Sequence, residues 1–334
     1  MKRKVQGVKL PMKELERIVF MGTPDFAQGI LEALLEDPHL TVVGVFTQPD
    51  KPVGRKGILT APPVKVRALE AGIPVFQPVK MRTEETIGLV RDLKPDAIVV
   101  AAYGKIIPQA ILDIPPCGCI NVHASLLPAY RGAAPIQWAI LEGETVTGVT
   151  AMRMNAGLDT GDMILKEETV IAPDETGGSL FDKLCVSGRK VIIEALDLIR
   201  EEKAVYEPQP EESPTPYAAT LSKKDGLIDW QMSAERIERQ VRALDPWPGT
   251  YTYFRGKQLK ILSGEVISRE SGAAAPGTVV RAGEEGIDIA AGDGVFRAAS
   301  VQLEGKKRMN AADFLRGASM EEGTVLGEPK KEEI

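Results

Sequence analysis

Histidine is scarce in this sequence: its 334 residues include only two, and only three cysteines. No apolar run approaches the roughly 20 residues of a membrane-spanning helix, and the basic N-terminal stretch lacks the apolar core of a secretion signal. Lys and Arg do not outnumber Asp and Glu, and the formal net charge is -6. Because no overall positive field attracts polyanions, any nucleic-acid surface has to be a local patch. We expect a cytoplasmic protein with no membrane anchor.

The cysteines, Cys117, Cys119 and Cys185, are an odd set, which suits a reducing compartment better than a disulfide framework. The stretch CGC at 117–119 is too short for a zinc site and has no second pair of ligands. We therefore expect buried thiols and no metal. A second Met, Met12, begins MKELERIVFMGTPDF, so the predicted fold begins there and leaves residues 1–11 out.

Strand-like runs alternate with helical stretches in the first part of the chain. The runs are rich in β-branched residues and nearly continuous in apolar character, which is typical of strands buried on both faces: 17–22, 41–48, 96–104 and 120–125. Helical stretches between them, such as 25–37 and 84–94, end near a proline. This order predicts an α/β fold with a doubly wound, mostly parallel sheet.

A proline-rich segment at 206–220, with its prolines among acidic and small residues, follows a helix predicted near 178–202. Such a composition indicates an extended linker. Beyond it, a helix at 233–244 and short alternating runs separated by Gly-containing turns predict a small β-rich domain, of the OB-like barrel type. The expected organisation is a first domain at 12–202, a linker at 203–221 and a β-barrel at 222–327.

The first of the two histidines, His123, lies in the predicted strand INVHAS. Side chains two residues apart share a face of a strand, so Asn121 and His123 point one way while Ile120 and Val122 point into a core. Ligands of open α/β sheets bind at the carboxyl ends of the strands, where this pair is expected. A histidine satisfied inside the core is the alternative. The other, His39, is expected in a loop.

A carboxylate that could face His123 is found in RMNAGLDTGDMILKEE, where Asp159 lies between Gly157 and Gly161. Such an Asp is more often a turn residue. Beside an imidazole, however, a carboxylate holds the ring and favours its charged form. Asn, His and Asp together stabilise an oxyanion and move a proton without a nucleophilic side chain. A dinucleotide site near Gly22 is not expected, because the stretch lacks G-x-G-x-x-G.

These stretches carry a resemblance that spacing alone does not supply. The sequence resembles the methionyl-tRNA formyltransferase family along nearly the whole chain, in FMGTPDFA, TQPDKPVGR, NVHASLLPAYRGAAPIQ, GLDTGDM, LSKKDGLIDW and DPWPGTY. The resemblance implies a Rossmann-like catalytic domain, a C-terminal β-barrel, and formyl transfer from 10-formyltetrahydrofolate to the α-amine of methionyl initiator tRNA. It also implies a tRNA-binding role for the barrel.

The resemblance also implies roles for single residues. The family's catalytic Asn, His and Asp fall on Asn121, His123 and Asp159. Its folate-contacting Ser-Leu-Leu-Pro falls on Ser125, Leu126, Leu127 and Pro128. Many relatives have a basic residue directly after this motif, whereas this chain has Ala129, which carries no charge.

The resemblance places the Arg of a loop that enters the tRNA acceptor stem on Arg55. That loop, 47–65, is long, basic and rich in Pro and Gly, which by itself is also typical of a solvated surface loop. Its other cations are candidate RNA contacts, as are pairs in the C-terminal part: Lys51 and Lys56; Lys223 and Lys224; Arg255 and Lys257; Lys306 and Lys307.

Two other function classes stay open. A folate-dependent formyltransferase acting on a small amine, such as an amino sugar or glycinamide ribonucleotide, would share the three catalytic residues but would need no second, RNA-sized domain. A catalytically silent RNA-binding module would not need the intact catalytic set. We expect a monomer that binds folate and tRNA and no membrane.

Overall fold

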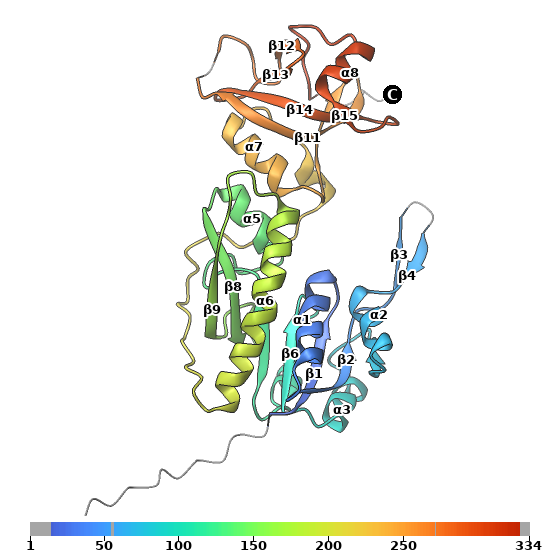
Figure 1. The fold of residues 1–334 in the computed structure, drawn as a ribbon, viewed down its shortest axis with the longest axis vertical. Coiled ribbons are helices and arrows are strands. Elements are labelled where there is room, and N and C mark those ends of the chain that lie inside the picture. The colour runs from blue at the N-terminus through green and yellow to red at the C-terminus, as the bar shows by residue number, and fades with distance from the viewer. Residues whose placement is uncertain (1–14, 55–56, 271, 328–334) are drawn as a thin grey trace, which may run out of the picture. The chain divides into compact units, whose positions relative to one another are not determined.

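The computed structural model describes residues 15–54, 57–270 and 272–327 (Figure 1). The chain divides into two compact units, each of which is described by itself. The first consists of Met1–Arg131, Gly148–Thr169 and Lys183–Tyr217. The second consists of Gly132–Thr147, Val170–Asp182 and Ala218–Ile334. The predicted domain limits at 202 and 222 stay predictions.

A seven-stranded sheet in the order β5-β2-β1-β6-β7-β8-β9 forms the centre of the first unit. Neighbouring strands from β5 to β7 are parallel, and β8 runs antiparallel to β7. The doubly wound, mostly parallel sheet predicted from the sequence is therefore confirmed. The strands are β1 (Arg17–Gly22), β2 (Thr41–Phe46), β5 (Val75–Phe76), β6 (Ala97–Ala101), β7 (Cys119–His123), β8 (Val146–Arg153) and β9 (Asp162–Val170).

Helices cover both faces of this sheet (Figure 1). On one face, buried side chains of β1, β6 and Cys119 pack with those of α3 and α4. On the other, α6 approaches α1 and β7 so closely that a Cβ on Gly188 would lie 2.9 Å from Ile30 and 3.5 Å from Val122. The helices are α1 (Asp25–Glu36), α2 (Pro63–Glu70), α3 (Glu84–Asp92), α4 (Gln109–Leu112) and α6 (Gly177–Arg200).

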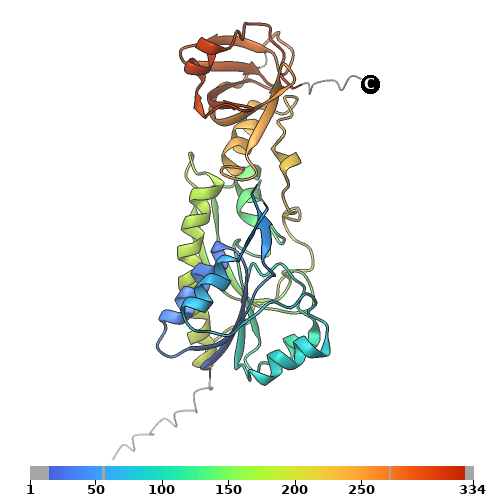
Figure 2. The same ribbon diagram turned by 90° about the vertical axis from the view of Figure 1, so that its right-hand side faces the viewer.

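The second unit contains a six-stranded antiparallel sheet in the order β10-β11-β14-β13-β12, with β15 beside β14. Irregularities in the β11–β14 register bend the sheet into a barrel-like form (Figure 2). Its core includes Ile237 and Val241 of α7. The elements are α5 (Pro135–Glu142), η1 (Lys223–Gly226), α7 (Ala234–Ala243), β10 (Thr250–Phe254), β11 (Lys257–Ser268), β12 (Val279–Gly283), β13 (Gly286–Ala290), β14 (Val295–Leu303), β15 (Met309–Asn310) and α8 (Ala311–Gly317).

Two connecting segments have structure that the sequence patterns did not indicate. The 47–65 loop contains an antiparallel hairpin of β3 (Lys51–Val53) and β4 (Ile58–Thr60), whose strands pair only with each other. The proline-rich segment is extended but not detached. Its Glu207 exchanges two backbone hydrogen bonds with Met163 of β9, at 2.8 and 2.9 Å. None of the described helices is long and apolar enough to cross a membrane.

Candidate active site

Asn121 and His123 occupy the carboxyl end of β7 on the same face as Cys119, as the alternation of the strand dictates. Their side chains are largely buried, with relative exposures of 8% and 6%. The Asn121 amide has no hydrogen-bond partner among the residues that the structure describes, although a buried amide costs free energy unless it is paired. It is therefore available to a bound substrate.

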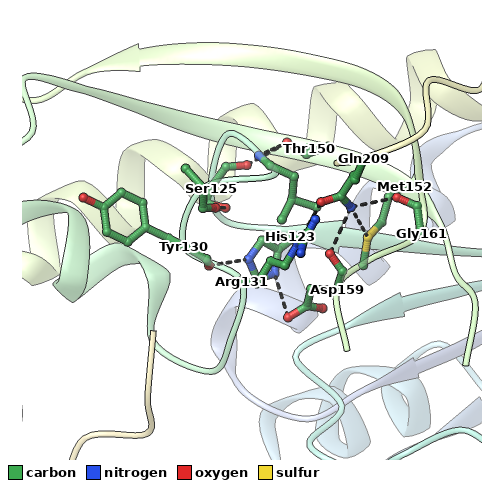
Figure 3. Close-up of polar contacts among 11 residues, drawn as sticks. His123, Ser125, Tyr130, Arg131, Thr150, Met152, Asp159, Gly161 and Gln209 are labelled. Carbon is green, nitrogen blue, oxygen red and sulfur yellow. Dashed lines mark hydrogen bonds and ion pairs between the residues drawn. The ribbon is translucent and has the colours of Figure 1, made fainter. Parts of the chain in front are cut away.

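Two groups face the imidazole of His123 (Figure 3). Its Nε2 lies 3.0 Å from the backbone carbonyl oxygen of Tyr130. A carbonyl oxygen only accepts, so Nε2 carries a hydrogen and donates it. Its Nδ1 lies 3.9 Å from Oδ2 of Asp159, which is close enough for charge attraction and too long for a hydrogen bond. Thus the Tyr130 carbonyl anchors the ring, and Nδ1 is the nitrogen left to exchange a proton.

Asp159 lies in the loop between β8 and β9, with a left-handed backbone at φ 53°. Within this loop the Asn155 side chain accepts from Gly157 N and Thr160 Oγ1, both at 2.9 Å. Gln209 reaches the loop from the proline-rich segment and donates to the carbonyl oxygens of Asp159 and Gly161 (Figure 3). The sequence placed Asp159 in a Gly-bounded turn, and the structure brings it opposite His123.

The segment that the resemblance assigned to folate follows β7 directly and is closed by its own hydrogen bonds. Ser125 is fully buried and its Oγ donates to the Ala129 carbonyl at 2.7 Å. Leu127 is buried with Met152 and Met163, and its N donates to Thr150 at 3.1 Å. The partly exposed side chains of the segment are Leu126 and Pro128, beside the partly exposed Ala129.

The proline-rich segment supports the site through contacts that sequence reasoning missed. Thr215 accepts a hydrogen bond from Tyr130 N at 2.6 Å, and Ser213 donates to the Pro128 carbonyl at 2.9 Å. Arg131 donates to Gln209 Oε1 at 3.0 Å. The available signals were weak: a lone Arg in a run of small residues, and a Gln between two prolines.

The cations proposed to bind tRNA come from separate stretches of the chain, of which the β10–β11 turn and the segment after β14 are neighbours, because Glu304 N donates to the Gln258 carbonyl at 2.8 Å. Lys51 lies in β3 and donates to Gln48 at 2.7 Å, whereas Arg55 and Lys56 lie outside the described residues. The cations of the second unit are exposed at three separate points of its chain: Lys223 and Lys224 in η1, Arg255 and Lys257 at the β10–β11 turn, and Lys306 and Lys307 between β14 and β15. Arg255 also donates to the Ser319 carbonyl at 2.7 Å.

The three cysteines are thiols, and two of them are buried. Cys117 and Cys119 are buried as expected, whereas Cys185 of α6 is only partly buried, so the prediction of a buried thiol is wrong there. Burial raises the pKa of the Cys119 thiol to about 12, so this thiol stays protonated and unreactive at neutral pH. No group of three or more His, Cys, Asp or Glu side chains suited to a metal ion occurs within 15–54, 57–270 and 272–327.

The sequence was compared with protein families and known proteins, and both of its parts match one family of enzymes. Residues 16–196 match the model described as formyl transferase, and residues 220–319 match formyl transferase, C-terminal domain. The methionyl-tRNA formyltransferases of Geotalea daltonii and Agathobacter rectalis are each 50% identical to the chain, over 93% of it and over 98% and 99% of their own lengths.

Solved structures at lower identity share the fold. The N-formyltransferase of Helicobacter canadensis, in complex with folinic acid and dTDP-3-aminofucose, is 17% identical with a TM-score of 0.60 over 88% of this chain and all of its own. HypX of Aquifex aeolicus, in complex with tetrahydrofolic acid, is 17% identical with a TM-score of 0.55 over 91% of this chain and 47% of its own. With relatives that are 50% identical over nearly their full length, the chain belongs to the methionyl-tRNA formyltransferase family.

Proposed function

We propose that the protein transfers the formyl group of 10-formyltetrahydrofolate to the α-amine of methionine carried by initiator tRNA. The observation that carries this proposal is the placement of Asn121 and His123 side by side at the end of β7, with Asp159 facing the imidazole at 3.9 Å. These are the residue types that acyl transfer to an amine requires when no nucleophilic side chain takes part. Family membership supplies the substrates that this chemistry would act on.

Asn121 is the proposed donor to the formyl oxygen. When the neutral amine attacks the formyl carbon, negative charge develops on that oxygen, and a fixed donor stabilises it more in the transition state than in the ground state. The Asn121 amide meets this need because it is held on a strand and is not engaged by another described residue. Such donors typically contribute about 10²- to 10³-fold in rate.

His123 is the proposed proton carrier, and it acts at Nδ1. The attacking amine has to lose a proton, and the folate nitrogen has to gain one as its bond to the formyl carbon breaks. Because Nε2 is held by the Tyr130 carbonyl, Nδ1 is the nitrogen free to take that proton and pass it on. The Asp159 carboxylate facing Nδ1 stabilises the positive charge during the transfer.

The segment of Ser125, Leu126, Leu127 and Pro128 is proposed to shape the folate site. The Ser125 hydroxyl and the Leu127 N–H already donate within the protein, so these two groups hold the loop in place rather than binding a ligand. Leu126 and Pro128 retain partly exposed apolar surface, which suits the flat ring of a folate. Ala129 offers no charge to the glutamate end of the molecule.

Initiator tRNA is the proposed macromolecular partner. The hairpin of β3 and β4 would carry Lys51 toward the acceptor end, and the exposed cations of the second unit would contact phosphates. Arg55 and Lys56, which lie outside the described residues, are proposed contacts from the sequence alone. Because aminoacylated initiator tRNA is used in translation, we place the enzyme in the cytoplasm, with no membrane partner. A monomer stays our expectation.

A substrate comparison tests the proposal. The purified protein is given 10-formyltetrahydrofolate with methionyl initiator tRNA, free methionine, an amino-sugar nucleotide or glycinamide ribonucleotide, and formylated products are measured. We expect turnover with the charged tRNA and at most traces with the others. Faster formylation of a small amine would replace the proposed substrate, and formylation of none of them would leave tRNA binding alone as the activity.

A further inference from the structure

We infer that Gln209 is a positioning residue for formyl transfer, which sets the Asp159 carboxylate opposite His123 from outside the reacting centre. This inference rests on the proposed function, since it concerns the same site. It assigns a role to the proline-rich segment, which a linker between two domains would not need. The network that carries it lies entirely within the first unit (Figure 3).

Gln209 forms two hydrogen bonds with the backbone of the β8–β9 loop, which carries Asp159. Its Nε2 donates to the carbonyl oxygen of Asp159 at 2.9 Å and to that of Gly161 at 2.7 Å. Both hydrogens of the amide group are therefore used on the loop that carries the carboxylate. A third, weaker contact joins Nε2 to the sulfur of Met152 at 3.9 Å. The position of Asp159 thus depends directly on the position of this amide.

Arg131 fixes the orientation of that amide. Its Nε donates to Gln209 Oε1 at 3.0 Å, which places the oxygen toward Arg131 and the nitrogen toward the loop. The rest of its guanidinium donates to the carbonyls of Pro210 at 2.7 Å and Glu211 at 3.0 Å. Arg131 is itself only 8% exposed, so its guanidinium group lies in a buried site. The planar guanidinium group thus donates hydrogen bonds to three acceptor oxygens.

These contacts lie on both sides of the imidazole and are connected to each other. Arg131 directly follows Tyr130, whose carbonyl anchors His123 Nε2, while Gln209 holds the residue that faces His123 Nδ1. The Arg131–Gln209 hydrogen bond therefore links the two groups that position the nitrogens of the imidazole. A displacement of Gln209 changes the gap between Asp159 and His123 without removing either side chain.

Backbone conformation explains why such support is needed. Asp159 and Tyr130 both have left-handed backbones, with φ of 53° and 54°. An L-residue with a side chain rarely adopts that conformation because its Cβ is crowded there, so the surroundings have to enforce it. Gln209 does so at the Asp159 carbonyl, and Thr215 of the same segment does so at Tyr130 N with a hydrogen bond of 2.6 Å.

Gln209→Glu is the decisive substitution. It keeps the size of the side chain and its contact with Arg131, but it turns a carboxylate oxygen toward two carbonyl oxygens that need a donor. Because a misplacement of about 1 Å costs up to about 10²-fold in rate, we expect kcat to fall about 10- to 100-fold. The KM values for both substrates should change by less than about threefold, since Gln209 acts on the backbone of the Asp159 loop rather than on a substrate. Glu212→Gln, an exposed change in the same segment, is the matched control and should leave kcat unchanged.

A double-mutant cycle separates positioning from general structural support. If Gln209 acts through Asp159, Gln209→Glu should lower kcat less than about threefold further in an Asp159→Asn background, because the carboxylate it positions is already gone. Equal losses in both backgrounds, or wild-type kcat in the single variant, would overturn the inference.

Further outcomes distinguish failure of this inference from failure of the proposed function. Gln209→Met removes both hydrogen-bonding groups without adding charge, and it replaces Gln209→Glu if the latter does not fold. If neither folds, as judged by circular dichroism and thermal unfolding, Gln209 serves stability and the inference is wrong. A wild-type protein that does not formylate methionyl-tRNA would instead contradict the proposed function.

Discussion

The loops that follow β7 and β2 begin at the same edge of one parallel sheet and are held in opposite ways. After β7, Ser125 and Leu127 are buried, and successive turns are fixed by hydrogen bonds to Thr150, Ala129 and Thr215. After β2, the side-chain hydrogen bonds that attach the described part of the loop to the rest of the protein lie at the base of that loop. There Asp50 accepts two hydrogen bonds from Lys65, both at 2.8 Å, and one from Gln77.

Beyond this base, the hairpin of β3 and β4 exposes the side chains of Lys51, Pro52, Ile58, Leu59 and Thr60. Ile58 and Leu59 of β4 are 62% and 66% exposed, and neither strand pairs with a sheet. A loop that acts on a bond has to hold atoms within a fraction of an ångström, whereas a loop that meets a large partner gains from reach and adaptability. The following predictions test whether the two loops divide the work in this way, from the largest effect to the smallest.

Replacing His123 should have the largest effect. His123→Ala removes the proton carrier from the fixed end of β7, and general acid–base groups contribute about 10²- to 10⁴-fold. We expect kcat for formylation to fall about 10³-fold or more with the fold intact. The other histidine supplies the control, since His39 is exposed in a loop and His39→Ala should behave as wild type. Near-normal turnover in His123→Ala would contradict the assignment.

Replacing Asn121 tests the oxyanion donor at the same strand end. Asn121→Ala should lower kcat by about 10²- to 10³-fold and leave both KM values within a few fold, because the lost hydrogen bond forms fully only in the transition state. Steady-state kinetics with each substrate varied in turn separates these terms. A loss that appeared mainly as a higher KM for folate would make Asn121 a binding residue instead.

The contrast also explains how much the sequence could predict. Periodicity predicted the parallel strands β1, β2, β6 and β7, the helices α1, α3, α6 and α7, and the shared face of Asn121 and His123. It did not predict the short parallel strand β5. The supports of the site were not, because they act on backbone carbonyls. Gln209 and Arg131 are 78 residues apart, and nothing in their side-chain types shows that each bonds to main-chain oxygens. Tyr130 contributes a carbonyl that every residue has.

The resemblance assigned roles that periodicity did not indicate, to Asp159 and to the Ser-Leu-Leu-Pro segment. It led to Asp159, which residue type and spacing alone favoured as a turn residue, and the structure places its carboxylate 3.9 Å from His123. It treated the Ser-Leu-Leu-Pro segment as a set of ligand contacts, whereas Ser125 and Leu127 are engaged within the protein. Tertiary contacts between distant segments decide which side chains stay available, and a linear motif does not contain them.

Replacing Arg55 probes the loop after β2, through an expectation that comes from the sequence because Arg55 lies outside the described residues. A charge-assisted hydrogen bond contributes about 1.5–3 kcal/mol, so Arg55→Ala should lower kcat/KM for methionyl-tRNA about 10- to 100-fold. The KM for 10-formyltetrahydrofolate should not change. Added salt should weaken the variant less than the wild type, since one ionic contact is already lost. Arg82→Ala, at another exposed cation, is the control.

Loosening the base of the hairpin should have the smallest effect. Hydrogen bonds from Lys65 and Gln77 hold the pKa of Asp50 below its ordinary value, so its carboxylate is charged at neutral pH. Asp50→Asn removes that charge and leaves the Lys65 ammonium without its ion-pair partner. The loop would then sample more orientations before it meets tRNA, while the end of β7 would be untouched.

We therefore expect Asp50→Asn to raise the KM for methionyl-tRNA about two- to fivefold, with kcat and the KM for folate unchanged. Because a carboxylate with a lowered pKa contributes its interactions above its ordinary pKa and loses them only as the pH falls through the lowered value, the ratio of variant to wild type should stay constant between about pH 6 and pH 8. Asp92→Asn, at an exposed residue of α3, is the matched control. A fall in kcat in Asp50→Asn would mean that the two strand ends are coupled rather than independent. A KM equal to that of the wild type would mean that the hairpin does not depend on this ion pair for its approach to tRNA.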